Sequence, residues 1–206
     1  MTDLSHGLAD KLVLVTGASR GIGRAVAVSA AVAGAELVIT GRTIGALEEG
    51  DDEIKAAGGK ATIVELDMKD TAAIPRLAAA IEGRWGRLDG LVANAGMLPA
   101  LTPVAHLQEK DWNESIAVNL SGQWHLIKAM DPLLRAAPAG RAILVSSGIS
   151  APLARTMASN LSCRPLSAVM VIPRSFCIQD ATPKSVVTEE PSANQAISFA
   201  GLMTRP

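Results

Sequence analysis

Tyrosine is absent from this chain of 206 residues, and the other aromatic residues are two phenylalanines and three tryptophans. No phenol is therefore available anywhere in the chain as a proton donor. The only cysteines, Cys163 and Cys177, are not spaced as a CxxC pair, which favours a reduced, cytoplasmic protein. We also expect no metal site.

Long apolar runs and an excess of one charge are absent as well. No apolar stretch approaches the ~20 residues that a membrane-spanning helix needs, and residues 1–6 lack the basic and apolar regions of a signal peptide. The formal net charge is −1, so neither nucleic-acid binding nor an acidic tail is indicated. With 49% hydrophobic residues, the composition is that of one globular domain with a full core.

Residues 8–147 alternate short apolar runs with longer segments of helical character. Strands are predicted at Lys11–Thr16, Glu36–Thr40, Lys60–Leu66, Gly90–Ala93 and Arg141–Ser146. Helices are predicted at Gly21–Ala33, Ile44–Ala57, from Asp70 or Thr71 to Trp85, and at Asp111–Leu134 with Pro132 as its boundary. Continuously apolar strands that alternate with helices are typical of a parallel sheet covered on both faces. We therefore predict an α/β protein with a doubly wound parallel sheet, the three-layer Rossmann fold.

The pattern changes after about position 150. All but one of the 18 glycines precede that position, whereas both cysteines, both phenylalanines and six of the 11 prolines follow it. Beyond it only Leu166–Ile172 has the pattern of a strand or a buried helical turn, since prolines divide the rest into short pieces. We expect one domain over residues 1–206, with a core at 8–150 and an irregular segment at 151–206. That segment is either a loop-rich substrate region or foreign to the fold, for example through a frameshift or an altered splice.

A glycine-rich stretch joins the apolar run Leu12–Val15 to the first predicted helix, and it reads Thr16-Gly17-Ala18-Ser19-Arg20-Gly21-Ile22-Gly23. Glycines on such a strand-to-helix turn let the backbone approach a phosphate, and the helix N-terminus offers unpaired N–H groups to the anion. The residues expected to bind a dinucleotide here are Gly17, Ser19, Arg20, Gly21, Ile22 and Gly23. A structural turn without a ligand is the alternative.

The residues that close the second predicted strand indicate which dinucleotide is bound. Proteins that bind NAD usually place an acid there, about 20 residues after the glycines, to hold the ribose 2′-hydroxyl. Glu36 opens this strand, whereas Thr40-Gly41-Arg42 close it. Arg42 is placed to meet a 2′-phosphate, and Arg20 can join it from the glycine loop. We therefore predict NADP(H) rather than NAD(H), with two solvated surface arginines as the alternative.

Further polar residues follow the predicted strands in a recognisable order. Asp67 follows the third strand, Asn94-Ala95-Gly96 the fourth, Asn119 lies within a helix, and Ser146-Ser147 end the fifth strand. Together with the glycine loop, this order resembles the short-chain dehydrogenase/reductase family over roughly the first 150 residues. The resemblance implies an oxidoreductase that moves hydride between NADP(H) and a small carbonyl or alcohol substrate.

The resemblance also implies a role for each motif. Asp67 and the backbone of Met68 would contact adenine, and Asn94, Ala95 and Gly96 would line the nicotinamide ribose side. Asn119 would hold a water of the proton relay, and Ser147 would orient the substrate oxygen. From the residues alone, a helix cap or a surface charge is the alternative for Asp67. The Asn94–Gly96 stretch is equally a strand-ending turn, and Asn119 a satisfied core amide or a helix kink.

One part of the family pattern is missing. In the family, a tyrosine beyond the serine exchanges the hydroxyl proton, and a lysine one helical turn further lowers its pKa. Counting from Ser147, these positions hold Asn160 and Arg164. An asparagine amide does not titrate near neutral pH, and Pro165 prevents a regular helix through that turn. We assign no catalytic role to either residue.

Three interpretations follow from this conflict. The first is a short-chain oxidoreductase altered after residue 150, and the second is a catalytically silent nucleotide-binding or oligomer-partner protein. The third is a chain that does not fold stably. The family forms homo-oligomers through the helix at Asp111–Leu134 and its successor, and Pro165 disrupts that successor here. We therefore expect poor dimerisation and an exposed apolar surface.

Overall fold

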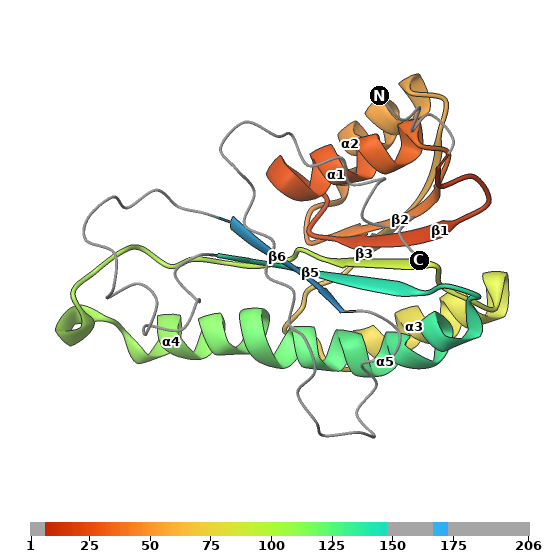
Figure 1. Ribbon diagram of the computed structural model, residues 1–206. Coiled ribbons are helices and arrows are strands. Elements are labelled where there is room, and N and C mark those ends of the chain that lie inside the picture. Colours follow the sequence, from red (N-terminus) through yellow and green to blue (C-terminus); the bar gives the residue numbers. More distant parts are fainter. Residues whose placement is uncertain (1–6, 148–166, 173–206) are drawn as a thin grey trace, which may run out of the picture.

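The computed structural model describes residues 7–147 and 167–172 of the chain. Its strands are β1 (Leu12–Thr16), β2 (Glu36–Gly41), β3 (Lys60–Glu65), β4 (Gly90–Ala93), β5 (Arg141–Ser147) and β6 (Ser167–Ile172). Its helices are α1 (Gly21–Val32), α2 (Ile44–Ala56), α3 (Ala73–Trp85), the 3-10 turn η1 (Val104–His106), α4 (Glu109–Ile116), the π-helical turn η2 (Ala117–Gly122) and α5 (Gln123–Ala136). The helices lie on the two faces of one sheet (Figure 1).

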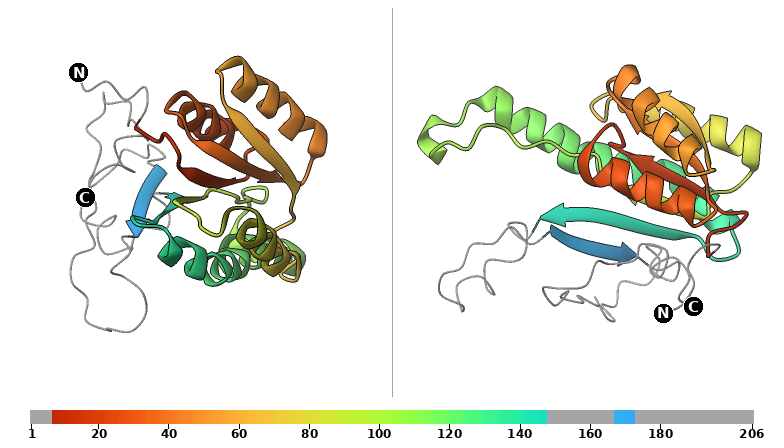
Figure 2. Two further views of the ribbon diagram at one scale, coloured as in Figure 1. Left: turned by 90° about the vertical axis from the view of Figure 1, so that its right-hand side faces the viewer. Right: turned by 90° about the horizontal axis from the view of Figure 1, so that it is seen from above.

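The sheet has the strand order β3-β2-β1-β4-β5-β6. The first five strands are parallel to their neighbours, which confirms the predicted parallel sheet. The sixth strand departs from it, because β6 pairs antiparallel with β5 from Ala142 opposite Ile172 to Ser147 opposite Ser167. Figure 2 shows β6, drawn in blue, along the edge of β5. The stretch predicted as a strand or a helical turn is therefore a strand.

The central strand β1 explains why helices cover both faces of the sheet. Successive side chains of a strand point to opposite faces, and all five residues of β1 are buried. Leu12 and Leu14 pack with the residues of α3 and α5, whereas Val13 and Val15 pack with those of α1 and α2. Burying an aliphatic side chain stabilises a fold by roughly 1.5–3 kcal/mol, so the alternation holds both helical layers in place. The three-layer α/β/α architecture is confirmed.

The helix predicted as one piece at Asp111–Leu134 differs from the structure in two ways. The helical path begins at Glu109 and continues to Ala136, but the π-helical turn η2 separates α4 from α5. The expectation that Pro132 bounds the helix is wrong, because this residue lies inside α5. A proline removes one helical hydrogen bond, to the carbonyl four residues earlier. Both Pro132 and Lys128 are exposed, so water can replace that bond.

The start of α3 is fixed by a side chain that the sequence identified. The Asp70 carboxylate oxygen Oδ1 accepts hydrogen bonds from the backbone N–H groups of Ala72 and Ala73, each at 3.1 Å. These are N–H groups that a helix leaves without partners at its first turn. Of the two residues predicted to cap this helix, Asp70 is therefore the one that bonds to its start, although the N-cap position itself is Ala72, which has no side-chain capping bond.

Among the residues described, no helix combines the length and the apolar character that crossing a membrane requires.

Candidate functional site

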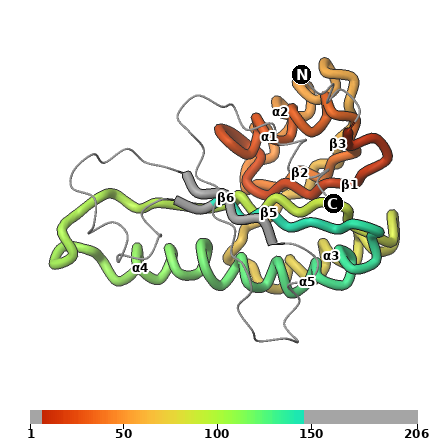
Figure 3. The backbone as a smooth tube through the Cα atoms, viewed as in Figure 1, coloured from red at the N-terminus to blue at the C-terminus, as the bar shows by residue number. Residues whose placement is uncertain are grey.

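The candidate site lies at the carboxyl ends of β1 and β4. The chain turns from β1 outward to β2 and β3 on one side, and to β4 and β5 on the other. In open α/β sheets a crevice forms where the strand order reverses in this way, and ligands bind there. Figure 3 shows the tube leaving β4, passing beyond the sheet and returning through α4 and α5. The sequence-predicted glycine loop and the Asn94-Ala95-Gly96 turn both end at this edge.

The two central strands are joined at this edge by a compact hydrogen-bond network. The buried Thr16 hydroxyl Oγ1 accepts from the backbone N–H of Asn94 at 3.1 Å and from that of Ala95 at 3.0 Å. The Asn94 side-chain amide Nδ2 donates to the carbonyls of Thr16 and Gly17 at 3.0 and 3.2 Å. The turn after β4 and the glycine loop after β1 are therefore held as one unit.

Glycine is required at two points of this unit. Gly17 has a φ of +66°, and a Cβ added there would lie 2.8 Å from the Ala95 Cα. A Cβ on Gly23 would overlap the Gly17 carbonyl and approach the Asn94 Nδ2 to 2.5 Å. A larger residue at either position would push the loop away from Asn94 or α1 away from the loop. The glycines thus set the close approach of loop, turn and helix.

The middle glycine of the loop, Gly21, faces open space. Gly21 has a φ of +58°, and a Cβ added there would meet no atom within 4 Å. It is the first residue of α1, whose N-cap Arg20 makes no side-chain capping bond and whose first turn holds no acid. The free N–H groups and the positive end of the helix dipole therefore border room that an anion can fill. These residues fit the pyrophosphate of a dinucleotide.

Two basic side chains flank this opening. Arg20 and Arg42 are exposed, and neither side chain makes a hydrogen bond or an ion pair within the part of the chain that the structure describes. Glu36 lies at the opposite end of β2 and lines a pocket at the amino ends of the strands. No carboxylate of β2 itself stands at this strand end, where a like charge would repel a phosphate. The Glu114 carboxylate on α4 is near enough to Arg42 for the guanidinium to contribute to the lowered pKa of Glu114.

The third-strand motif adopts an ordered turn. Asp67 Oδ1 accepts from the backbone N–H of Lys69 at 2.9 Å, and Met68 is buried in the core. Lys69 Nζ lies 2.7 Å from the Glu114 carboxylate on α4 and 3.9 Å from that of Asp67. The nearby Glu114 carboxylate raises the pKa of Lys69, and the ammonium in turn lowers the pKa of Glu114. Asp67 is thus a turn-forming residue rather than a free surface charge.

Asn119 lies in the π-helical turn η2 and is exposed. Its Oδ1 accepts from the Met97 backbone N–H at 2.9 Å, and its Nδ2 donates to the Met97 carbonyl at 2.7 Å. Both ends of the amide therefore bind the segment that follows Gly96. Irregular π-helical turns within helices are frequent at functional sites. The structure places Asn119 beside the turn after β4, the region of the motif that the resemblance assigns to nicotinamide ribose.

The remaining predicted residues are only partly within the described structure. Ser146 and Ser147 end β5, next to β4, so their backbone lies at the same sheet edge as the other motifs. Asn160 and Arg164, the counterparts of the family's tyrosine and lysine, lie outside the described residues.

Three residues of the site were not singled out from the sequence. Thr16 ties β1 to β4, Arg24 donates to the carbonyls of Ser19 and Ala46, and Gln123 donates to the carbonyl of Ala95. Their shared signal is a polar side chain one to four residues from a motif glycine or asparagine. That signal is weak, because it does not specify a partner.

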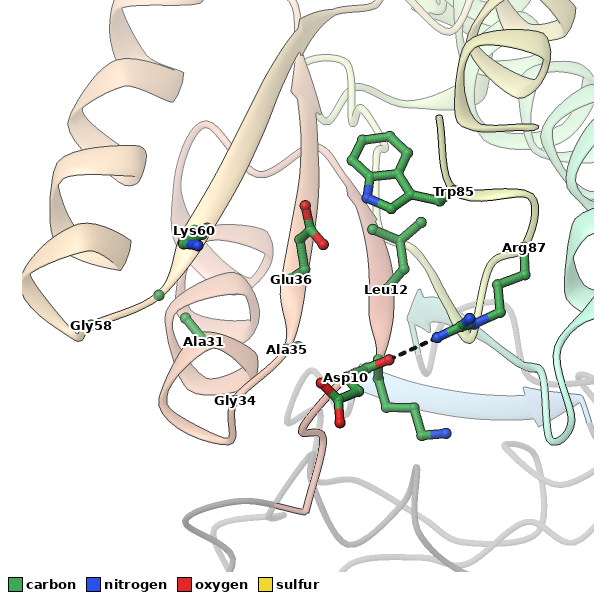
Figure 4. Close-up of a pocket in the computed structure, with 12 residues that line it drawn as sticks. Asp10, Leu12, Ala31, Gly34, Ala35, Glu36, Gly58, Lys60, Trp85 and Arg87 are labelled. Carbon is green, nitrogen blue, oxygen red and sulfur yellow. Dashed lines mark hydrogen bonds between the residues drawn. The ribbon is translucent and has the colours of Figure 1, made fainter. Parts of the chain in front are cut away.

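A pocket of about 480 Å³ lies elsewhere (Figure 4). It is lined by residues at the amino ends of the strands, among them Lys11, Glu36 and Lys60. Because β1, β2 and β3 are parallel, this pocket is at the opposite edge of the sheet from the glycine loop. It is therefore distinct from the sheet edge at which the motifs lie.

The fold and the glycine loop are those of a Rossmann-type protein. A sequence model of the family described as short chain dehydrogenase matches residues 11–159. The chain therefore belongs to the short-chain dehydrogenase family.

Individual relatives agree with this assignment. A 3beta-hydroxysteroid dehydrogenase of Mediterraneibacter gnavus is 36% identical over 148 residues, which cover 68% of this chain and 50% of that protein. An uncharacterized oxidoreductase of Listeria innocua is 34% identical over 138 residues, covering 67% and 55%. The chain thus spans about half the length of these curated relatives. A crystal structure from Escherichia coli CFT073, described as a short chain dehydrogenase complexed with NADPH, aligns with a TM-score of 0.68 at 31% identity, covering 71% of this chain and 62% of that one.

Proposed function

We propose that this chain binds NADP(H) as a short-chain oxidoreductase that acts on a carbonyl or alcohol, and that its turnover is low because the proton donor is missing. The observation that carries the proposal is the opening at Gly21. It lies at a helix N-terminus without a side-chain cap and is flanked by two exposed arginines whose side chains make no hydrogen bond or ion pair in the described part of the chain. The Escherichia coli structure that binds NADPH supports the choice of cofactor.

Different residues of the chain would bind different parts of the cofactor. The backbone of Gly21, Ile22 and Gly23 would hold the pyrophosphate, while Arg20 and Arg42 would hold the 2′-phosphate. Guanidinium groups suit this task because they keep their charge and offer several donors. The Asp67-Met68 turn would border adenine, and Asn94, Ala95 and Gly96 would border the nicotinamide ribose. When bound, the nicotinamide supplies or accepts the hydride.

Two further residues would act on the substrate side. Ser147 would orient the substrate oxygen by hydrogen bonding, and Asn119 would help to hold a water of the proton relay. The contacts of Asn119 with Met97 support the second role, since they fix the amide next to the turn after β4. Removal of a general acid costs typically 10²–10⁴-fold in rate. We infer a loss on that scale for this chain.

The absence of tyrosine favours a second candidate function, a catalytically silent nucleotide-binding protein or oligomer partner derived from such an enzyme. The two candidates share the cofactor site and differ only in turnover.

Titration calorimetry with NADPH and with NADH tests the shared cofactor site. We expect NADPH to bind more tightly, because only NADPH carries the 2′-phosphate. Equal or reversed affinities would reject the preference, and no binding of either dinucleotide would reject the proposal.

A further inference from the structure

Arg24 connects the glycine loop to α2. It lies in α1, and its Nη2 donates to the carbonyl of Ser19 in the loop and to the carbonyl of Ala46 in the first turn of α2, each at 2.7 Å. The same nitrogen lies 3.0 Å from the Glu49 carboxylate, and Nη1 lies 3.4 Å from that of Glu53. One guanidinium therefore holds segments that are more than 20 residues apart in the sequence.

The environment of Arg24 makes this contact specific. Its side chain is 21% exposed, whereas those of Glu49 and Glu53 are 70% and 53% exposed. The carboxylates are thus in solvent, where ion pairs contribute little, and the carbonyl contacts lie on the more buried side. Hydrogen bonds from a charged donor to backbone carbonyls are stronger than neutral ones. Both carbonyl contacts are made by Nη2, at the end of a side chain one bond longer than that of lysine, so the ammonium of a lysine would fall short of this position.

The two segments that Arg24 joins carry the two phosphate subsites of the proposed cofactor site. Ser19 lies in the loop that borders the pyrophosphate opening. Ala46 lies in the first turn of α2, which begins just after Arg42. Two other contacts join the same region, since the backbone N–H of Ala18 donates to the carbonyl of Thr40 and that of Leu66 donates to the carbonyl of Gly41, each at 2.9 Å. Those contacts fix the strand ends but not the first turn of α2.

We propose that Arg24 is a positioning residue for NADP(H), which sets the spacing between the pyrophosphate subsite at the glycine loop and the 2′-phosphate subsite at Arg42. This inference rests on the proposed function. Arg24 itself does not touch the cofactor in this proposal. It lowers the free energy of binding only for ligands that occupy both subsites at once, because a correct spacing gives no advantage to a ligand with one phosphate.

The binding of three adenosine phosphates distinguishes a positioning role of Arg24 from a purely structural one. These binding measurements do not depend on catalytic activity. The ligand 2′,5′-ADP carries both phosphates, whereas 2′-AMP and 5′-AMP carry one each. For Arg24→Met we expect the Kd of 2′,5′-ADP to rise about tenfold, because the ligand must then order the two subsites itself on binding. The Kd values of 2′-AMP and 5′-AMP are expected to change less than about twofold on the same scale. Calorimetric or fluorescence titration measures all three.

Matched variants serve as controls. Glu53→Gln removes the longer ion pair and leaves both carbonyl contacts, so 2′,5′-ADP is expected to bind as it does to the unmodified chain. Arg76→Met removes an exposed arginine on α3 that pairs with Asp70, and it is also expected to have no effect. Arg24→Lys keeps the charge and provides a second test if Arg24→Met fails to fold. Arg24→Lys is expected to weaken the binding of 2′,5′-ADP but not that of 2′-AMP or 5′-AMP.

Each outcome of these titrations either supports or overturns the positioning role of Arg24. Selective loss of 2′,5′-ADP affinity supports the proposal. Equal losses for all three ligands, or loss of thermal stability with unchanged Kd values, would show a purely structural role and overturn it. If the unmodified chain binds neither NADPH nor 2′,5′-ADP, the proposed function itself fails and this inference fails with it. If the unmodified chain binds both and Arg24→Lys binds them equally well, only this inference is wrong.

Discussion

The side-chain amide of Asn94 donates a 3.0 Å hydrogen bond to the backbone carbonyl of Thr16, while the Thr16 hydroxyl accepts a bond from the Asn94 backbone N–H at 3.1 Å. The two residues are reciprocal partners although they are 78 positions apart in the sequence. The last residue of β1 and the first residue after β4 are therefore locked together. These hydrogen bonds fix the sheet edge at which the cofactor would bind under the proposed function.

Removal of the Thr16 hydroxyl tests the hydrogen bonds that join β1 to the turn after β4. Thr16→Val keeps the shape of the side chain but leaves the N–H group of Ala95 without its acceptor and that of Asn94 with the Val92 carbonyl alone, and an unsatisfied buried donor costs about 1–3 kcal/mol. We expect the free energy of unfolding to fall by about 2 kcal/mol in urea denaturation. Thr62→Val in β3 is the control, since its hydroxyl has no partner among the described residues. Equal effects of both substitutions would contradict the role of Thr16.

Reversal of the charge at Arg42 tests the 2′-phosphate subsite. Arg42→Asp places a negative charge at the end of β2, where it would repel the 2′-phosphate. We expect NADPH to bind about tenfold or more weakly, the effect of losing one charge-assisted contact, while NADH binding is nearly unchanged. Arg76→Asp, which makes the same charge change on α3, controls for net charge. A parallel loss of NADPH and NADH affinity would place the 2′-phosphate elsewhere.

The ion pair of Lys69 and Glu114 predicts a pH dependence. Lys69 lowers the pKa of Glu114 below its ordinary value of 4.5, chiefly through their hydrogen bond, so this stabilisation is present above pH 4.5 and is lost as the pH falls through the lower folded value. Glu114 raises the pKa of Lys69 above 10.5, and that contribution is lost as the pH rises through the folded value.

We therefore expect Glu114→Gln to lower thermal stability slightly near neutral pH, and the difference from the unmodified chain to vanish in acid. Melting curves from pH 3 to pH 8 measure this. Glu48→Gln on α2 serves as the control, because Glu48 is exposed and has no partner among the described residues. A difference that grows as the pH falls would contradict the assignment.

An apolar stripe runs along α4, η2 and α5. Trp112, Ile116, Leu120 and Trp124 follow one another at intervals of four residues and are 37–62% exposed. Exposed apolar stripes of this kind mark association sites or aggregation-prone surfaces. We expect concentration-dependent association without one discrete dimer, because Pro165 interrupts the segment that would follow β5 as a helix.

Sedimentation velocity checks this expectation. Leu120→Lys is expected to reduce association, whereas Val32→Lys, at an exposed apolar site on α1, is expected to leave it unchanged. A clean dimer that persists on dilution would contradict it.

Strands, layers and the glycine loop follow from the sequence because their signals are local. An apolar run such as Leu12–Val15 and a cap such as Asp70 specify their structure within a few residues. The links made by Thr16, Arg24 and Asn119 were not predictable in this way, since each depends on a backbone group that only the fold brings near. The π-helical turn is the clearest case. The Asn119 side chain in this turn binds the backbone of Met97, which is 22 positions away in the sequence. A periodic helical pattern reveals neither the turn nor this contact.

The catalytic prediction concerns the residue type that the chain lacks. Asn160→Tyr together with Arg164→Lys is not expected to restore activity, because Pro165 follows directly and interrupts a helix that would carry both residues. Replacement of the whole segment after Ser147 by that of an active family member is expected to restore it. Recovery with the two substitutions alone would show that the helix forms despite Pro165.

The most direct test follows NADPH absorbance during incubation of the unmodified chain with saturating NADPH and a panel of ketones and aldehydes. Calorimetry on the same sample confirms that the cofactor is bound. The account predicts bound NADPH with little or no oxidation, at rates roughly 10²–10⁴-fold below those of family members with the tyrosine. Rapid NADPH oxidation would contradict it and would point to another acid, with His125 and His106 the first to replace.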